Sequence, residues 1–235
     1  MENIINAYRA NIKKLPVSAA VYETMRTAII FNKLPFNYRI KEEEFAKLLH
    51  VSRTPVREAI NILMNRGLIV SDMKNGFVVK GFTTNEANDI AKYASTLRRE
   101  AAGLTARAAT TEQIIILEKN MITNEKIQQL KPVGEHDELY QIFQRFNLLV
   151  AKFSNNKYLY FESERMQEKL LLMHYYYPEE IKNDHPVEKF AIQNMKVFEA
   201  IMMHDSAKAR RAIEEYDVQI YNVTRHMYNL RKDYK

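Results

Sequence analysis

The stretch VSRTPVREAINILMNRGLIV, residues 51–70, begins with basic and hydroxyl-bearing residues and continues with regularly spaced apolar residues. Ser52 or Thr54 can cap a helix here, and Pro55 falls in its first turn, where no intrahelical donor is lost. Apolar side chains then recur at helical spacing, at Val56, Ile60 and Leu63 or Met64. Gly67 ends the pattern. A helix that only packs does not need a basic first turn, so this one is expected to offer its N-terminal end to a ligand.

The segments on either side of this helix complete a recognisable unit. Upstream, residues 16–34 have helical spacing with Ser18 as a cap candidate, and KEEEFAKLLH predicts a short helix whose acidic first turn suits the helix dipole. A short turn, HVS, joins it to the central helix. Downstream, LIVSD and FVVKGF read as two strands joined by a turn that contains Asn75-Gly76. The order helix, helix, turn, helix, hairpin predicts a winged helix-turn-helix with a small β-hairpin wing.

The basic first turn has the chemistry of a DNA-reading helix. Arg53 and Arg57 are four residues apart and therefore share one helix face. An arginine fork can grip a guanine edge in the major groove with two hydrogen bonds. The second helix of a helix-turn-helix enters that groove with its N-terminal residues nearest the bases.

Further contacts to the DNA backbone are predicted around these arginines. Ser52, Thr54 and the free N–H groups of the first turn can hold phosphate. At the wing tip, Lys74 and Asn75 would reach the adjacent groove or backbone, and Gly76 allows close approach. The alternative to DNA contact is that Arg53 and Arg57 are ordinary solvated surface charges.

Composition agrees with a polyanionic partner and excludes several protein classes. Residues 1–80 carry 13 Lys and Arg against 7 Asp and Glu, so the first third holds the whole net charge of +6. The absence of cysteine excludes disulfides and thiolate metal sites. Neither a signal peptide nor a long apolar run is visible, so we expect a soluble cytoplasmic protein without a membrane partner. No nucleophile–base constellation or phosphate loop points to an enzyme.

The rest of the chain is predicted to be helical throughout. Six helical segments follow the wing, at residues 84–109, 110–130, 139–154, 158–176, 187–203 and 207–230. Thr84 and Asn85 are cap candidates for the first, and Thr110-Thr111-Glu112 opens the second. We therefore expect a mainly α protein with two domains: a winged helix-turn-helix over 1–82 and an antiparallel all-α bundle over 83–235.

These segments resemble a known family. VSRTPVREAINILMNRGLI followed by NGFVV closely resembles the signature of the GntR family of bacterial regulators, and VYETMRTAIIFNKL is similar to that family's first helix. AAGLTARAATTEQI, FNLLVAKFSNNKYL and VFEAIMMHDSAKARRAI resemble the C-terminal FCD domain of the FadR subfamily. The resemblance implies a homodimeric transcription regulator, expected to be a repressor, that binds a palindromic operator in double-stranded DNA.

The resemblance also locates an effector site, in which this chain departs from the family. Many FCD domains bind a divalent metal through one Asp and three His, and these positions fall here on Phe143, Asn147, Asn194 and Tyr216. Phenylalanine cannot ligate, and amides and phenols are poor substitutes for imidazole, so we expect no metal and no cofactor. The same four residues would instead floor a pocket for a small organic effector that is neutral or weakly acidic, with Tyr140 and Arg165 as lining.

Several alternatives remain open at this stage. The altered site can equally be packed shut, which would make the protein an effector-independent dimeric repressor. The arginine that some relatives use for an effector's carboxylate falls on Ala94 or Thr96, and either Arg98 or Arg99 could take its place.

The N-terminal domain also departs from the family at three turns. Asn32, Asn37 and His50 stand where the family usually has glycine, so left-handed backbone is expected at these three residues.

Overall fold

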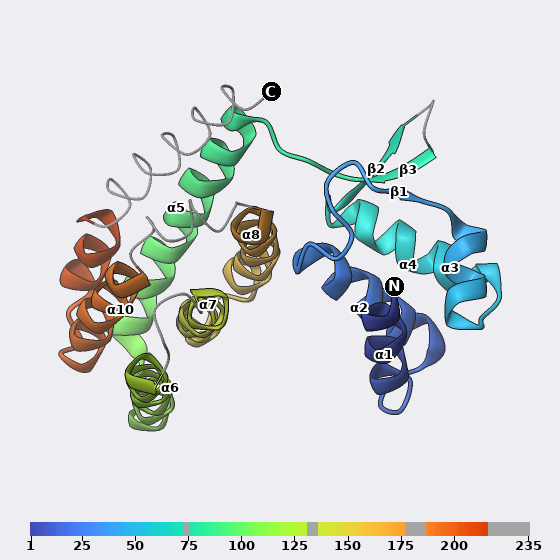
Figure 1. Ribbon diagram of the computed structural model, residues 1–235. Coiled ribbons are helices and arrows are strands. Elements are labelled where there is room, and N and C mark those ends of the chain that lie inside the picture. The colour runs from blue at the N-terminus through green and yellow to red at the C-terminus, as the bar shows by residue number, and fades with distance from the viewer. Residues whose placement is uncertain (73–75, 131–135, 177–186, 216–235) are drawn as a thin grey trace. The chain divides into compact units, whose positions relative to one another are not determined.

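A computed structural model of the chain describes residues 1–72, 76–130, 136–176 and 187–215. The chain separates into two compact units. The first comprises Met1–Phe82 with Leu171–Tyr176, and the second comprises Thr83–Leu170 with Tyr177–Lys235. Helices dominate both units, and a small antiparallel sheet lies in the first, so the predicted fold class is confirmed (Figure 1).

The first unit contains four helices and three short strands among its described residues. They are α1 (Glu2–Asn11), α2 (Val17–Ile30), β1 (Arg39–Ile40), α3 (Glu42–Leu49), α4 (Arg53–Asn65), β2 (Ile69–Asp72) and β3 (Gly76–Val79). Helix α2 packs along α4, and α3 packs against the same helix. The core between them is fully buried, with Met25, Ile29, Phe45, Ile60 and Leu63 at 0–1% exposure. This core fixes the orientation of α4.

The ends of the helices agree with the sequence analysis at α4 and differ from it at α2. Ser52 is the N-cap residue of α4, although its side chain accepts no capping hydrogen bond, and Gly67 follows the helix at φ +73°. Helix α2 instead starts at Val17 after Pro16, so the prediction of Ser18 as its cap was wrong. The Ser18 hydroxyl donates to Glu58 on α4, an exposed contact between the two helices that helical spacing does not reveal.

The wing is a three-stranded sheet rather than a bare hairpin. β2 and β3 pair antiparallel with Ile69 opposite Val79, and β1 adds to the other side of β3 (Figure 1). A strand of two residues is too short to produce an alternating pattern, which explains why the sequence predicted only the hairpin. Lys74 and Asn75 lie outside the described residues. Gly76 begins β3 at φ +72°, a conformation that favours glycine.

The three residues that replace family glycines do adopt left-handed backbone, as expected. Asn32, Asn37 and His50 have φ of 55°, 65° and 55°. His50 is the C-cap of α3, and its N–H donates to the carbonyl oxygens of Ala46 and Lys47. This backbone reversal sets the turn that leads directly into α4.

The second unit is built from long helices. They are α5 (Thr84–Ala108), α6 (Thr111–Leu130), α7 (His136–Phe153), most of α8 (Lys157–Tyr176), α10 (Val187–Met202) and helical residues 206–215. α7 packs against α5, α6 and α10. Small side chains on α5 (Ala101, Ala102 and Ala106) are buried against larger ones from the other helices, among them Leu117, Phe146 and Ile201. The small alanine side chains leave room for the larger ones of the neighbouring helices.

The N-caps of the bundle also refine the prediction. Helix α5 is capped by Thr83, which forms a capping box with Glu86, so the choice of Thr84 or Asn85 was one or two residues late. At α6 the predicted Thr110 accepts from the Gln113 N–H while the Gln113 side chain accepts from the Thr110 N–H. Each box satisfies two backbone donors that the first helical turn leaves unpaired.

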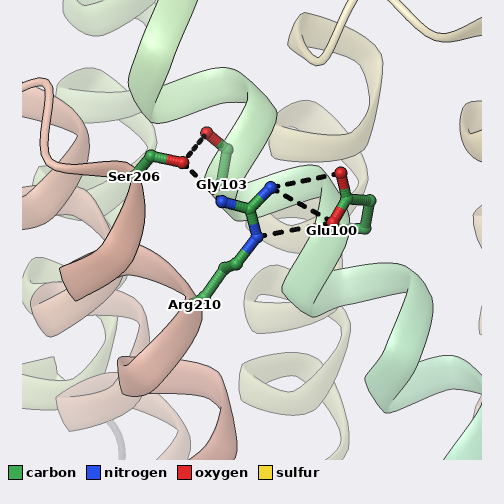
Figure 2. A network of polar contacts seen from close by, with 4 residues as sticks. All are labelled: Glu100, Gly103, Ser206 and Arg210. Carbon is green, nitrogen blue, oxygen red and sulfur yellow. Dashed lines mark hydrogen bonds and ion pairs between the residues drawn. The ribbon is translucent and has the colours of Figure 1, made fainter.

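A polar network ties α5 to the helical segment 206–215 (Figure 2). Arg210 donates to both carboxylate oxygens of Glu100 and, at 2.6 Å, to Ser206 Oγ. The Ser206 hydroxyl donates in turn to the Gly103 carbonyl oxygen at 2.8 Å. A Cβ at Gly103 would overlap the Arg210 Cζ. Arg210 reaches Glu100 across the space that Gly103 leaves open.

Candidate nucleic-acid interface and effector cavity

The predicted DNA-reading residues lie together at the start of α4. Ser52, Arg53, Thr54 and Arg57 are all exposed, and the side chains of the two arginines are 59% and 63% accessible. They are held in place by the opposite, buried side of the helix, at Val56, Ala59 and Ile60. A basic, hydroxylated helix end on a rigid core has the form that DNA recognition in the major groove requires.

Both arginines are paired with the acidic first turn of α3, a relationship that the sequence analysis missed. Arg57 Nε lies 3.1 and 3.2 Å from the two oxygens of Glu42, and its Nη2 donates to Glu42 Oε2 at 2.8 Å. Arg53 Nη2 contacts the Glu43 carboxylate. The glutamates had been interpreted only as helix-dipole residues. The helix-turn-helix fold, rather than sequence spacing, brings the two helix N-termini together.

The pairing affects the electrostatics of both partners. The hydrogen bond and charge of Arg57 lower the pKa of Glu42 from its ordinary value of 4.5, despite the partial burial of this carboxyl. In the reverse direction, Glu42 raises the pKa of Arg57. Both groups are therefore fully ionised at neutral pH, and the guanidinium has a charged partner in the absence of DNA.

A shallow hollow lies beside this helix end. It is lined by Glu43, Ala46, Lys47, His50, Val51, Ser52 and Arg53. Two cations, Lys47 and Arg53, flank it together with the amino end of α4, whose backbone N–H groups favour anions. The hollow therefore combines two cations and the helix N–H groups with the carboxylate of Glu43, which pairs with Arg53.

In the bundle, three of the four positions that the resemblance implies for metal ligands form a hydrogen-bonded cluster. Phe143 is fully buried, and its carbonyl oxygen accepts from Asn147 Nδ2 at 3.2 Å and from Asn194 Nδ2 at 3.3 Å. Tyr216 lies outside the described residues, and Tyr140 lies in α7 with a side chain that the structure does not describe. No group of three or more His, Cys, Asp or Glu that could hold a metal ion is found in the described part of the chain.

A small cavity of about 20 Å³ lies next to this cluster. It is lined by Ala94, Arg98, Gln144, Asn147, Leu148, Ser163, Met166, Gln167 and Leu170. The volume holds roughly one water molecule, and the lining is rich in hydrogen-bonding groups. The buried Ser163 Oγ and Asn194 Oδ1 have no hydrogen-bond partner among the described residues.

The cavity distinguishes between the two arginine candidates. Arg98 lines it, one helical turn after Ala94, whereas Arg99 points elsewhere and pairs with Glu214 at 2.9 Å. Arg165, predicted as lining, is not among the lining residues; its side chain is 40% exposed and pairs with Glu162 on its own helix.

Among the helices that the structure describes, none is long and apolar enough to cross a membrane.

Comparison with known proteins identifies both units. Residues 17–79 match the family described as bacterial regulatory proteins, gntR family, and residues 89–217 match the FCD domain. An HTH-type transcriptional regulator of Bacillus subtilis, YdhC, is 27% identical over 86% of this chain and 88% of its own length. The HTH-type transcriptional repressor RspR of Escherichia coli K12 is 21% identical over 93% of each chain. The solved structure of E. coli McbR/YncC superposes with a TM-score of 0.75 at 18% identity, over 91% of this chain and 99% of that one, and supports the fold alone.

Proposed function

Because the chain belongs to the GntR family of bacterial regulatory proteins and carries an FCD domain typical of the FadR-like subfamily, we propose that it is a sequence-specific repressor. It binds a palindromic operator as a homodimer. Residues 1–82 form the DNA-binding domain, and residues 83–235 form the domain that dimerises and binds a small organic effector without metal. The membership in the family makes it a transcription regulator, and the finer statements are our inference.

One observation carries the DNA-binding assignment. Arg53 and Arg57 are both exposed on one face at the N-terminal end of α4, next to the hydroxyl groups of Ser52 and Thr54. The cations that read bases and the groups that hold phosphates therefore occur on the same helix end. The relative named as a repressor, RspR, supports the sign of regulation.

The DNA-binding assignment is tested by operator selection from randomised duplex DNA followed by titration at several salt concentrations. Arg57→Ala should weaken binding to the selected site by about 1–3 kcal/mol and relax base preference. Lys74→Ala should chiefly reduce the slope of log affinity against log salt, by about one unit. Arg107→Ala, which removes an exposed charge from α5, is the matched control. Unchanged sequence selectivity in the Arg53→Ala/Arg57→Ala double variant would refute the assignment.

The homodimer and the palindrome are tested together. Two recognition helices related by a two-fold axis read half-sites about one helical turn apart. Sedimentation should give twice the chain mass, and the selected DNA should contain an inverted repeat. A monomer that selects a single half-site would contradict this part of the proposal.

The effector assignment is supported by the cavity next to the Asn147–Asn194 cluster. Arg98 could meet an acidic group, while Ser163 Oγ, which has no hydrogen-bond partner among the described residues, could meet a neutral one. Because about 20 Å³ admits only a water-sized molecule, an organic effector must displace lining side chains. To regulate, it must also favour one placement of the DNA domains over another.

A second candidate function is the effector-independent dimeric repressor. It is favoured by the amides of Asn147 and Asn194, which already donate to one carbonyl oxygen and leave little open volume. A thermal-shift screen of small carboxylic acids and neutral polar compounds separates the two. A hit that raises the unfolding temperature and changes operator affinity, both lost in Ser163→Val or Arg98→Met, supports the effector. If no compound changes either quantity, the effector-independent repressor stands.

A further inference from the structure

We propose that Glu42 is a positioning residue for DNA recognition, which holds one edge of the Arg57 guanidinium so that the other edge faces the bases. The inference rests on the proposed function, since it assumes that Arg57 reads DNA. It adds an acidic residue on α3, outside the recognition helix, to the determinants of sequence specificity.

The hydrogen-bond geometry leaves the arginine free to act. Nε–H and one Nη2–H occupy the Glu42 carboxylate, at 3.1 and 2.8 Å to its nearer oxygens. A guanidinium has five N–H donors in a planar fork, so the Nη1 group and the second Nη2–H remain available on the adjacent edge. That edge presents two donors, which can grip two acceptors of a guanine. Glu42 therefore restricts the rotation of Arg57 without consuming the donors that recognition needs.

The carboxylate is also well placed to act as an anchor. The Glu42 side chain is only 17% exposed, against 63% for Arg57, so the acid is the fixed partner and the arginine projects from it. Glu42 stands at the start of α3, whose Phe45, Ala46 and Leu49 are buried in the core. An arginine held in its bound conformation loses less rotamer freedom on binding DNA than a free one does.

The neighbouring glutamates lack this geometry and supply matched controls. Arg53 and Glu43 make a single Nη2 contact and are both more than half exposed. Glu44 pairs with Lys41 in the same exposed turn and has no contact with either arginine among the interactions described. Glu43 and Glu44 thus lower the positive potential of the surface, whereas Glu42, of these three, holds a guanidinium at two nitrogens.

The test measures specificity separately from affinity. Duplex DNA randomised over about two helical turns is selected with the full-length wild-type protein. The base preference at each position and the ratio of specific to non-specific Kd are then compared among variants. Glu42→Gln should lower this ratio about tenfold and flatten preference at the position that Arg57→Ala also flattens. Glu44→Gln removes the same charge and should leave the ratio within about twofold of wild type.

A double-mutant cycle excludes a merely structural role. In an Arg57→Ala background, Glu42→Gln should cause no further loss of base preference, because its effect acts through Arg57. An equal loss in that background, or an unchanged ratio in Glu42→Gln alone, overturns the inference while sequence-specific DNA binding stands. If the wild type selects no sequence at all, the proposed function fails and the inference fails with it. Glu42→Asp keeps the charge but is too short to reach both nitrogens of Arg57, so it should still lower the ratio of specific to non-specific Kd.

Discussion

Asn147 of α7 and Asn194 of α10 donate side-chain hydrogen bonds to the same acceptor, the carbonyl oxygen of Phe143. Both residues occupy positions at which the family resemblance implies metal-binding histidines. The Asn194 hydrogen bond therefore links α10 to α7, whereas the Asn147 bond lies within α7. It leaves Asn194 Oδ1 buried without a partner among the described residues, an arrangement that costs free energy unless something binds there.

The first prediction follows from this orphaned oxygen. Asn194→Leu should stabilise the protein against denaturant by about 1 kcal/mol, because it removes a buried unpaired acceptor while Asn147 still donates to Phe143. Asn147→Leu is the control, since its side chain is only half-buried. Destabilisation of 2 kcal/mol or more by Asn194→Leu, on the order of a broken buried network, would show that Oδ1 has a partner.

A second prediction concerns metal. Phenylalanine and two amides make a poor ligand set, so neither excess Zn²⁺ or Mn²⁺ nor a chelator should move the unfolding temperature by more than about 1 °C. A site occupied at a hundred times its Kd would add about 2.7 kcal/mol, which corresponds to a shift of several degrees. Elemental analysis of the purified protein should agree. Stoichiometric metal, lost together with stability on chelation, would contradict the prediction.

The first unit shows how far sequence reasoning reaches. The start and end of α4, the hairpin and the left-handed residues followed from capping, glycine placement and the family motif, because these signals are local. β1 and the Glu42–Arg57 pair did not follow. Two residues cannot show a period, and a contact across 15 positions depends on the angle between α3 and α4.

The second unit shows the same limit at the effector site. The sequence offered both Arg98 and Arg99 as carboxylate receptors and could not choose, because adjacent residues on a helix point about 100° apart. The packing of α5 separates the two side chains: Arg98 lines the cavity, whereas Arg99 pairs with Glu214. The size of the cavity was equally inaccessible, since it depends on how side chains from three helices fill space.

A third prediction tests the contact between Gly103 and Arg210. Gly103→Ala should change stability by less than about 0.5 kcal/mol, because about 1 kcal/mol of improved helix propensity is offset by the displaced Arg210 network. In an Arg210→Ala background, where the obstructing guanidinium is gone, the same change should stabilise by about 1 kcal/mol. Denaturant unfolding of the wild type, Gly103→Ala, Arg210→Ala and the double variant gives the coupling free energy between the two positions. Identical effects in both backgrounds would mean that Arg210 moves aside at no cost.

The last prediction uses the lowered pKa of Glu42. A carboxyl whose pKa is lower in the folded than in the unfolded state adds stability above its ordinary value of 4.5 and loses it as pH falls through the folded pKa. Glu42→Gln should therefore unfold at a lower temperature than wild type at pH 7, and the difference should shrink below pH 4.5 and vanish in stronger acid. Arg57→Ala should show the same pH dependence, because the arginine causes most of the shift. A difference between wild type and Glu42→Gln that stays constant down to about pH 3 would show that packing, rather than the ion pair, explains the effect.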